Sequence, residues 1–491
     1  MKSAFLLGLI LNLAIVGTAP AVDTAEFNIY GSTEFPATGN AKAHEIFVQG
    51  LLKLHNFEYD DARANFIATQ EMDPDFAMAY WGESLTYEHH LWAYKNIEGS
   101  RAALAKIGAT PEARAEHFKT EREKAYHRSV EALFGEGSQE ERETAYSAEL
   151  KQIYQNYPED LDAAALYALS LITTSHGGRD YSRYMQAASI TEDILVLNPR
   201  HPGALHYNIH SYDDPVHAPL GLRAAKVYSE VAPSAIHALH MGSHIYYALG
   251  MWELGLERNI RSYEEAVSRQ PTPDDEYGNQ AYHALTWVIY GLNQVNRPEE
   301  SAEKLALIEA QMNQYGGQIH RQNFIYGRAA YVIDSGDWTG SLASVSVSHE
   351  GLDPFFVATD QYVHGVRLLK SGDTDGAKEA LAGIGGAEPV AVKNRRAMVP
   401  RLLHLQLEGQ IEFAAGNQEK AIALMKEAAE MEAGVPPEYG PAQPAQPAAE
   451  LLADTYLAIG DNQSARENYE IALESFVGRQ RSLAGLKKAS M

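Results

Sequence analysis

The stretch AHEIFVQGLLKLHNFEYDDARANFIATQEMDPDF, residues 43–76, contains the spacing that decides the fold. Gly50, Ala62, Phe66 and Pro74 follow one another at intervals of 12, 4 and 8 residues. Small residues allow two helices to approach closely, an aromatic residue fills the gap between them, and a proline opens the next helix. The stretch therefore predicts a helical hairpin.

Similar spacing returns nearer the C-terminus, where LKSGDTDGA, FAAGNQEKA and LAIGDNQSA read as three versions of one hairpin turn. Strand signals are almost absent from the whole chain. This pattern resembles the tetratricopeptide repeat (TPR), and the resemblance covers most of the sequence. It implies an all-α fold, a right-handed α-solenoid of TPR-like helical hairpins, in which the first helix of each pair lines a concave groove.

Composition narrows the classes of function. The chain has 491 residues, 45% of them hydrophobic, and a formal net charge of −25, so it can bury a large core. The acidic balance argues against a nucleic-acid partner, because little positive charge is available to neutralise phosphates. Since there is no cysteine, a disulfide framework and thiolate metal sites are excluded.

The first residues, MKSAFLLGLILNLAIVGTAPAV, have the pattern of a secretory signal peptide. A lysine precedes an apolar run, Ala4 to Val16, that is too short to span a bilayer. We expect cleavage near Ala21, a periplasmic or secreted protein, and no stable membrane insertion.

The repeat frame also predicts how the chain is divided. TPEARAEHFKTEREKAYHRS indicates a long charged helix outside the strict repeat, and VPPEYGPAQPAQP, residues 435–447, a stiff loop between the last two hairpins. The expected order is a signal peptide (1–21), an N-terminal extension (22–40), TPR-like repeats (41–90), an irregular helical insertion (91–160), central TPR-like repeats (161–345) and C-terminal TPR-like repeats (346–491).

Histidines gather in the central repeats. The stretch HYNIHSYDDPVHAPLGLRAAKVYSEVAPSAIHALHMGSH, residues 206–244, holds six of the chain's 19 histidines. In the repeat frame one unit runs from Pro202 to Ala235 and the next begins at Ile236. Five of these histidines then fall on positions that line the groove in proteins of this repeat class; they are His206, His210, His237, His240 and His244.

Helix geometry supports the same grouping. His206 and His210 are separated by four residues, as are His240 and His244, so each pair lies on one face of its helix. Two adjacent helices that each present such a pair can place four imidazoles around one point, as metal sites in helix bundles do. Asp213 or Asp214 would supply a further oxygen ligand or orient an imidazole through its free N–H.

The order of the motifs resembles a family of uncharacterised exported bacterial TPR proteins with HYxIHxxD and HALHMxSHI motifs. The matching stretches are WGESLTYEHHLW, HYNIHSYDDP, HALHMGSHIYYALGMW, YHALTWVIY and RSLAGLKKA. The resemblance implies a shared site and no particular reaction. Gly242 replaces the family's proline, and Ala449 stands where the family usually has a histidine. The residues it carries over are His89, His206, His210, Asp214, His240, His244 and His283.

These observations lead to a metal-site hypothesis and to alternatives. Nitrogen ligands without sulfur suit copper, iron or zinc, whereas calcium and magnesium want mostly oxygen. A proton-switched or anion-binding groove and structural polar packing are the other interpretations. The expected ligands are His206, His210, His237, His240, His244, His283 and His89.

Two functions from different classes fit this site. The first is a metalloenzyme, an oxidoreductase or a hydrolase, that acts on a small molecule in the concave groove with Asp213, Asp214 or Glu88 as the base. The second is a metal-free TPR scaffold that binds a peptide or protein segment in the groove. The sequence has no HExxH motif and no nucleophile elbow to decide between them.

Overall fold

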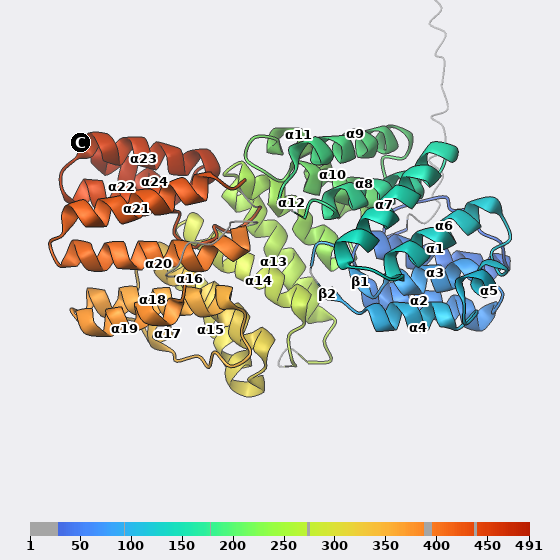
Figure 1. Ribbon diagram of the computed structural model, residues 1–491, viewed down its shortest axis with the longest axis horizontal. Helices are drawn as coiled ribbons and strands as arrows, with labels where there is room; N and C mark the ends of the chain where they lie inside the picture. Colours follow the sequence, from blue (N-terminus) through green and yellow to red (C-terminus); the bar gives the residue numbers. More distant parts are fainter. Residues whose placement is uncertain (1–27, 93, 177, 273–274, 387–394, 437–438) are drawn as a thin grey trace, which may run out of the picture.

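The structure, a computed structural model, describes residues 28–491 except 93, 177, 273–274, 387–394 and 437–438. The expected signal peptide lies outside the described residues. Paired helices follow one another from the N-terminal end of the molecule to the C-terminal end (Figure 1). Within the described residues no helix has the length and apolar character needed to cross a membrane.

The elements, in chain order, divide into three parts. The N-terminal part contains α1 (Ala41–His55), α2 (Tyr59–Met72), α3 (Ala77–Leu85), β1 (Glu88–His89), β2 (Tyr94–Lys95), α4 (Ile97–Ala105), α5 (Pro111–Ala115), α6 (Glu121–Phe134) and α7 (Gln139–Asn156). The central part contains α8 (Leu161–Thr173), α9 (Tyr181–Leu197), α10 (Pro202–Tyr212), α11 (Ala218–Val231), α12 (Ile236–Ala248), α13 (Trp252–Ser268), α14 (Asn279–Gln294), α15 (Pro298–Tyr315) and α16 (Gln318–Ser335). The C-terminal part contains α17 (Ser341–Ser344), α18 (Pro354–Lys370), α19 (Thr374–Ile384), α20 (Arg395–Ala414), α21 (Gln418–Ala433), α22 (Ala448–Ala458), α23 (Asn462–Ser475) and α24 (Gln480–Ala489).

Helices that follow one another in sequence pack as hairpins, for example α1 with α2, α10 with α11 and α20 with α21. First helices of successive hairpins also touch, as α10 and α12 do, and α12 and α14. The predicted all-α solenoid of TPR-like hairpins is confirmed.

The spacing in residues 43–76 works as the sequence predicts. The Phe66 ring is fully buried and packs against two glycines, Gly50 on α1 and Gly82 on α3. A Cβ atom would lie 2.8 Å from that ring at Gly50 and 2.5 Å from it at Gly82. Because real Cβ contacts are longer, the two glycines allow three helices to close around one aromatic side chain.

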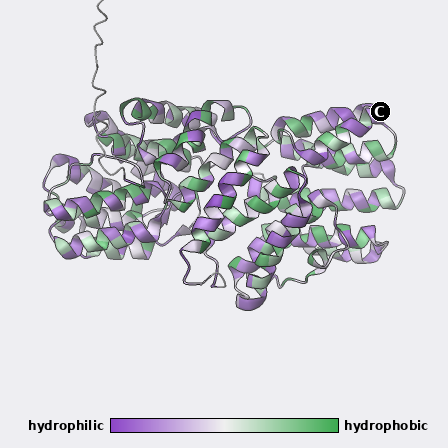
Figure 2. Ribbon diagram, turned by 180° about the vertical axis from the view of Figure 1, so that it is seen from behind, coloured by the Kyte–Doolittle hydropathy of each residue, from purple (hydrophilic) through white to green (hydrophobic). Residues whose placement is uncertain are grey.

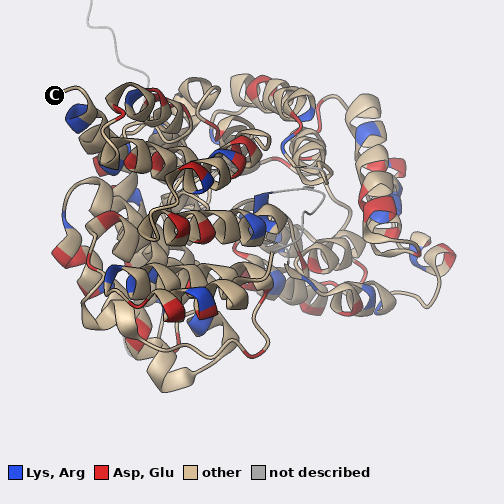
Figure 3. Ribbon diagram, turned by 60° about the vertical axis from the view of Figure 1, so that its left-hand side comes forward, with Lys and Arg blue, Asp and Glu red and all other residues tan. Residues whose placement is uncertain are grey.

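Polarity follows the same helical pattern. Hydrophobic and hydrophilic residues alternate along most helices (Figure 2), as expected when one stripe of each helix faces the core. Acidic and basic residues are interspersed on many helices (Figure 3). The net negative charge is thus spread over the surface.

The prediction of one long charged helix in the stretch TPEARAEHFKTEREKAYHRS is wrong. Helix α5 ends at Ala115 and α6 begins at Glu121. Between them the Phe118 side chain is buried, and Thr120 caps α6 in a capping box with Glu123. Burial of the aromatic ring and a strong N-cap together break the charged run into two helices.

An ion-pair network joins these two helices. The Glu131 carboxylate accepts hydrogen bonds from Arg114 Nε at 2.6 Å and His127 Nε2 at 2.8 Å. Burial alone would raise the pKa of Glu131, but the hydrogen bonds from His127 and Arg114 lower that pKa to about 2. The carboxylate therefore stays ionised and holds α5 against α6.

A buried arginine links the C-terminal end of the chain to the central hairpins. Arg479 is fully buried, and its guanidinium donates to Glu450 Oε2 at 2.8 Å, to the Asp334 carboxylate and to the Tyr290 hydroxyl at 3.3 Å. These partners lie on α22, α16 and α14. The start of α24 is thereby tied to the central hairpins.

Candidate metal centre

Six imidazoles lie in contact where α10, α12 and α14 meet. Neighbouring ring centroids are close, for example 5.0 Å for His206 and His210, and 4.4 Å for His240 and His283. Five of the six side chains are buried and that of His283 is half-buried. We call this group the histidine cluster; it consists of His206, His210, His237, His240, His244 and His283.

The repeat frame positions the cluster. Helix α10 begins at Pro202 and α12 at Ile236, as the sequence predicts. The four-residue spacing then stacks His206 and His210 on one face of α10, and α12 presents its three histidines opposite them. Both helix starts are confirmed, and the histidines of the two helices lie close together in neighbouring groups.

The Nδ1 atom of four cluster imidazoles is held by an acceptor. His206 Nδ1 donates to the His55 carbonyl oxygen at 2.8 Å. His210 Nδ1 and His244 Nδ1 both donate to Asp213 Oδ2, each at 3.0 Å. Carbonyl and carboxylate oxygens can only accept, so the Nδ1 atoms carry the protons and the Nε2 atoms present lone pairs.

Asn259 is the hydrogen-bond acceptor for the Nδ1 atom of His240. Its Oδ1 accepts from His240 Nδ1 at 2.5 Å, and its Nδ2 donates to the Gly255 carbonyl at 2.9 Å. The second bond fixes the amide so that its oxygen faces the imidazole. The Nε2 atom of His240 is thus left with a lone pair as well.

These lone pairs converge. His240 Nε2 lies 2.9 Å from both His244 Nε2 and His283 Nε2, and His206 Nε2 lies 3.1 Å from His237 Nε2. With the protons of His240 and His244 on Nδ1, two lone pairs face each other with no proton between them. Such an arrangement is stabilised by a cation.

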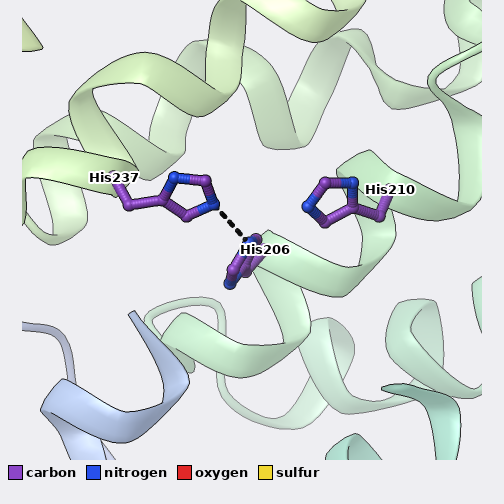
Figure 4. Close-up of side chains that lie close together, drawn as sticks. All are labelled: His206, His210 and His237. Carbon is purple, nitrogen blue, oxygen red and sulfur yellow. Dashed lines mark hydrogen bonds between the residues drawn. The ribbon is translucent and has the colours of Figure 1, made fainter. Parts of the chain in front are cut away.

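A buried ring nitrogen that faces other imidazoles also lies on the other side of the cluster. Among the described residues, the buried His210 Nε2 has no hydrogen-bond partner. Its ring points toward the space that His206 and His237 also face (Figure 4). A buried nitrogen in this state calls for a partner, and a metal ion would supply one.

Burial and neighbouring imidazoles favour the neutral form of five histidines of the cluster. Burial lowers the pKa of His206, His237 and His240 well below the ordinary value, and nearby imidazoles lower it further. The same two causes lower the pKa of His283 to about 3. Burial is also the largest cause for His244, whose pKa falls to about 4. Neutral imidazole is the form that binds metals.

The carboxylate under the cluster is ionised. Burial alone would raise the pKa of Asp213, but Arg179 and the His210 and His244 imidazoles lower it below the ordinary range. Arg179 donates to Asp213 and, at 3.3 Å, to Asp214, which also accepts from His217 Nδ1 at 2.8 Å. Asp213 thus contacts two imidazoles, which it can orient, and its carboxylate also forms with His210 and His244 a group close enough to hold a metal.

The structure places Glu88 and His89 differently from the sequence expectation. The sequence predicts them as a base and a metal ligand of the site, but α3 ends at Leu85 and both residues lie beyond it in β1. The Glu88 carboxylate pairs with Lys95. The His89 ring stacks on Tyr59, with centroids 3.9 Å apart. In the described part of the chain, neither residue is in contact with the histidine cluster.

A pocket of about 370 Å³ adjoins the cluster, and His89 lies in its wall. His237, His240 and His283 line it from the cluster side. Aromatic, amide and basic side chains from several hairpins form the rest of the wall. They include Trp92, Trp287, Tyr326, Phe355, Phe356, Tyr439, Asn279, Asn323, Gln443 and Arg396.

The proline-rich segment contributes more than the connection that the sequence predicts. Tyr439 lies in it, and its ring stacks on His244 with centroids 4.5 Å apart. Next to it, Gly440 has φ +85°, and a Cβ there would lie 2.3 Å from the Trp287 ring. Only glycine allows this approach. The signal in the sequence is the tyrosine directly before a glycine within a proline-rich run, PPEYGP.

No family model matches the chain, and no curated protein sequence matches it. Solved structures match at low identity. The Cut9–Hcn1 hetero-tetramer of the APC/C is 11% identical over 94% of this chain and 79% of that chain, with a TM-score of 0.39. Yeast Tom70 is 14% identical over 91% and 95%, with a TM-score of 0.32. The human IFIT1 dimer with m7Gppp-AAAA is 13% identical over 94% and 92%, with a TM-score of 0.40. Matches at these TM-scores assign neither an activity nor a partner to this chain.

Proposed function

We propose that this protein is a metalloprotein that binds a transition metal through the histidine cluster and a small molecule in the adjoining pocket. One observation carries the proposal. The imidazoles of His206, His210, His240 and His244 are each held at Nδ1 by an acceptor, so their Nε2 lone pairs are directed inward. Outer hydrogen bonds of this kind orient histidines at metal sites.

The ligand chemistry narrows the metal. Six imidazoles with no sulfur suit copper, iron or zinc and disfavour calcium and magnesium. An ion of this class supplies Lewis-acid or redox chemistry. We therefore propose either an oxidoreductase or a hydrolase activity, and the identity of the metal selects between them.

The residues around the ion have distinct parts in this proposal. His237, His240 and His283 line the pocket, so a small molecule there would meet the metal from their side. Aromatic rings such as Trp287, whose centroid lies 4.6 Å from that of His240, exclude water from the cluster. Asp213 is a positioning residue, because both imidazoles that it contacts lie in the cluster.

A second candidate, a metal-free scaffold that binds a peptide, is favoured by the amide groups of the pocket. Asn279, Asn323 and Gln443 line its wall, and side-chain amides can pair with an extended peptide backbone. Capture of peptides from a random library by the chelator-treated protein, with no metal bound at any stage, would favour this function.

We also propose, from the N-terminal pattern and the resemblance to exported bacterial proteins, that the chain acts outside the cytoplasm. Intact mass of the protein from a periplasmic or secreted fraction tests this. A chain that begins at Val22 supports export, and an uncleaved N-terminus argues against it.

The metal proposal has a direct test. The protein is purified without a histidine tag after growth with copper, iron and zinc, and metals per chain are counted by elemental analysis. The variant with both His206→Ala and His240→Ala should lose the metal and keep its helicity by circular dichroism. His364→Asn, which changes an exposed histidine on α18, serves as the control. Absence of metal from the wild type under every condition refutes the proposal.

A further inference from the structure

We infer that the histidine cluster holds two metal ions, one in each of two sets of three histidines. This inference rests on the proposed function, since it concerns the same site. The first set is His206, His210 and His237, and the second is His240, His244 and His283. In each set one ligand atom from every residue lies within 4.8 Å of those from the other two.

Distances within each set fit one ion. Three nitrogens around an ion at a metal–nitrogen distance of 2.0–2.1 Å lie about 3.3–3.6 Å apart. The separation of His206 Nε2 and His237 Nε2 is 3.1 Å. In the second set, His240 Nε2 is 2.9 Å from its two neighbours. Shifts of a few tenths of an ångström would bring these three pairs to binding geometry, and the remaining ligand atoms of each set lie within 4.8 Å.

One ion shared by all six imidazoles fits less well. Six nitrogens at about 2.1 Å from one centre would all lie within about 4.2 Å of one another. Within the described residues, the six histidines instead form two groups of three, and a further group joins His210 and His244 through Asp213 at the boundary between them. Three protein ligands and an open position are typical of metal sites that meet a substrate.

The two sets of histidines share one hydrogen-bond acceptor. Asp213 Oδ2 accepts from His210 of the first set and from His244 of the second, each at 3.0 Å. The two sets touch at the same point, since the ring centroids of these histidines are 5.1 Å apart. One carboxylate thus orients one imidazole of each set, which places the two sites side by side.

Both sets reach the same pocket. His237 of the first set and His240 and His283 of the second line its wall. One small molecule in the pocket could therefore contact both ions. Two neighbouring ions on one ligand act as a clamp on its oxygen atoms, so the ligand class is a small molecule with oxygen donors.

The number of ions per chain tests the inference. The metal-free full chain is titrated with Zn²⁺ alone, and bound ions are counted by native mass spectrometry. We expect two ions for the wild type and for His364→Asn, and one ion for His210→Asn and for His283→Asn. Circular dichroism checks that the variants remain folded.

The outcomes separate the two proposals. One ion per wild-type chain overturns the two-ion inference and leaves the metal proposal standing. Two ions that persist in both His210→Asn and His283→Asn also overturn it, because neither set would then be a ligand set. No bound ion overturns the metal proposal and this inference together. If a variant unfolds, Cu²⁺ bound to the wild type decides: loss of electron paramagnetic resonance intensity at the second equivalent supports adjacent ions, and doubled intensity overturns them.

Discussion

Replacing Asp213 by asparagine tests whether metal binding depends on the tautomer of the imidazoles that Asp213 contacts or on the negative charge of Asp213. In the wild type one carboxylate oxygen accepts from His210 and His244, while the other accepts from Arg179. An asparagine has one accepting oxygen and one donating nitrogen. Because Arg179 can only donate, the amide oxygen turns to it and the amide nitrogen faces the imidazoles.

The consequence is a change of tautomer. An N–H donor beside Nδ1 requires Nδ1 to carry the lone pair, so the proton moves to Nε2 and the metal loses its ligand atom. Loss of one outer partner of a metal ligand costs about 10–100-fold in affinity. Since Asp213 supports two imidazoles, we expect Asp213→Asn to lie at the upper end, about 100-fold or about 2.7 kcal/mol.

Competition with a chelator at fixed pH measures this loss as a change in the Zn²⁺ dissociation constant. Asp214→Asn is the matched control, because it removes the same charge beside Arg179, and within the described residues Asp214 makes no hydrogen bond to a cluster imidazole. An affinity of Asp213→Asn within twofold of wild type would refute the tautomer argument. Equal losses in the two variants would show that charge is the cause.

Three further predictions follow from other contacts. Asn259→Leu removes the acceptor of His240 Nδ1 and should weaken Zn²⁺ binding about tenfold in the same competition; unchanged affinity would contradict this role. Arg479→Met leaves the buried Asp334 carboxylate without its ion pair, while Glu450 keeps Arg481 Nε at 3.0 Å, and should lower the free energy of unfolding in urea by about 3–5 kcal/mol; a loss below about 1 kcal/mol would count against the network. The pKa of Glu131 is about 2 in the fold and about 4.3 in an unfolded chain. Its carboxylate therefore adds stability above about pH 4 that is lost as the pH falls toward 2. Glu131→Gln should show a shallower decline over that range, and an equal slope would refute the assignment.

Local pattern was enough to predict the hairpins and the cluster. Pro202 opens α10 and Ile236 opens α12 because the repeat spacing fixes both boundaries. Once the helices are fixed, the 3.6-residue period determines which histidines share a face. His283 lies one hairpin later, on α14, and the resemblance to the exported proteins is what indicates it.

Other parts of the site depend on contacts that no local pattern records. Tyr439 meets His244 across nearly two hundred residues of sequence, and Arg179 and Asn259 act through single hydrogen bonds. The turn after α3 was also missed. Leu91 has φ +68° there, a conformation that a glycine would have signalled and a leucine does not.

Helix α12 supplies histidines to both sets, and this has a consequence for how such a chain can change over generations. A repeat array tolerates gain or loss of whole units, because each unit contacts mainly its neighbours. Here three consecutive units, from α10 to α15, must stay together and in order for the two sets to exist. Gain or loss of whole units is thus confined to the parts of the chain before α10 and after α15. The number of units between these two helices is fixed.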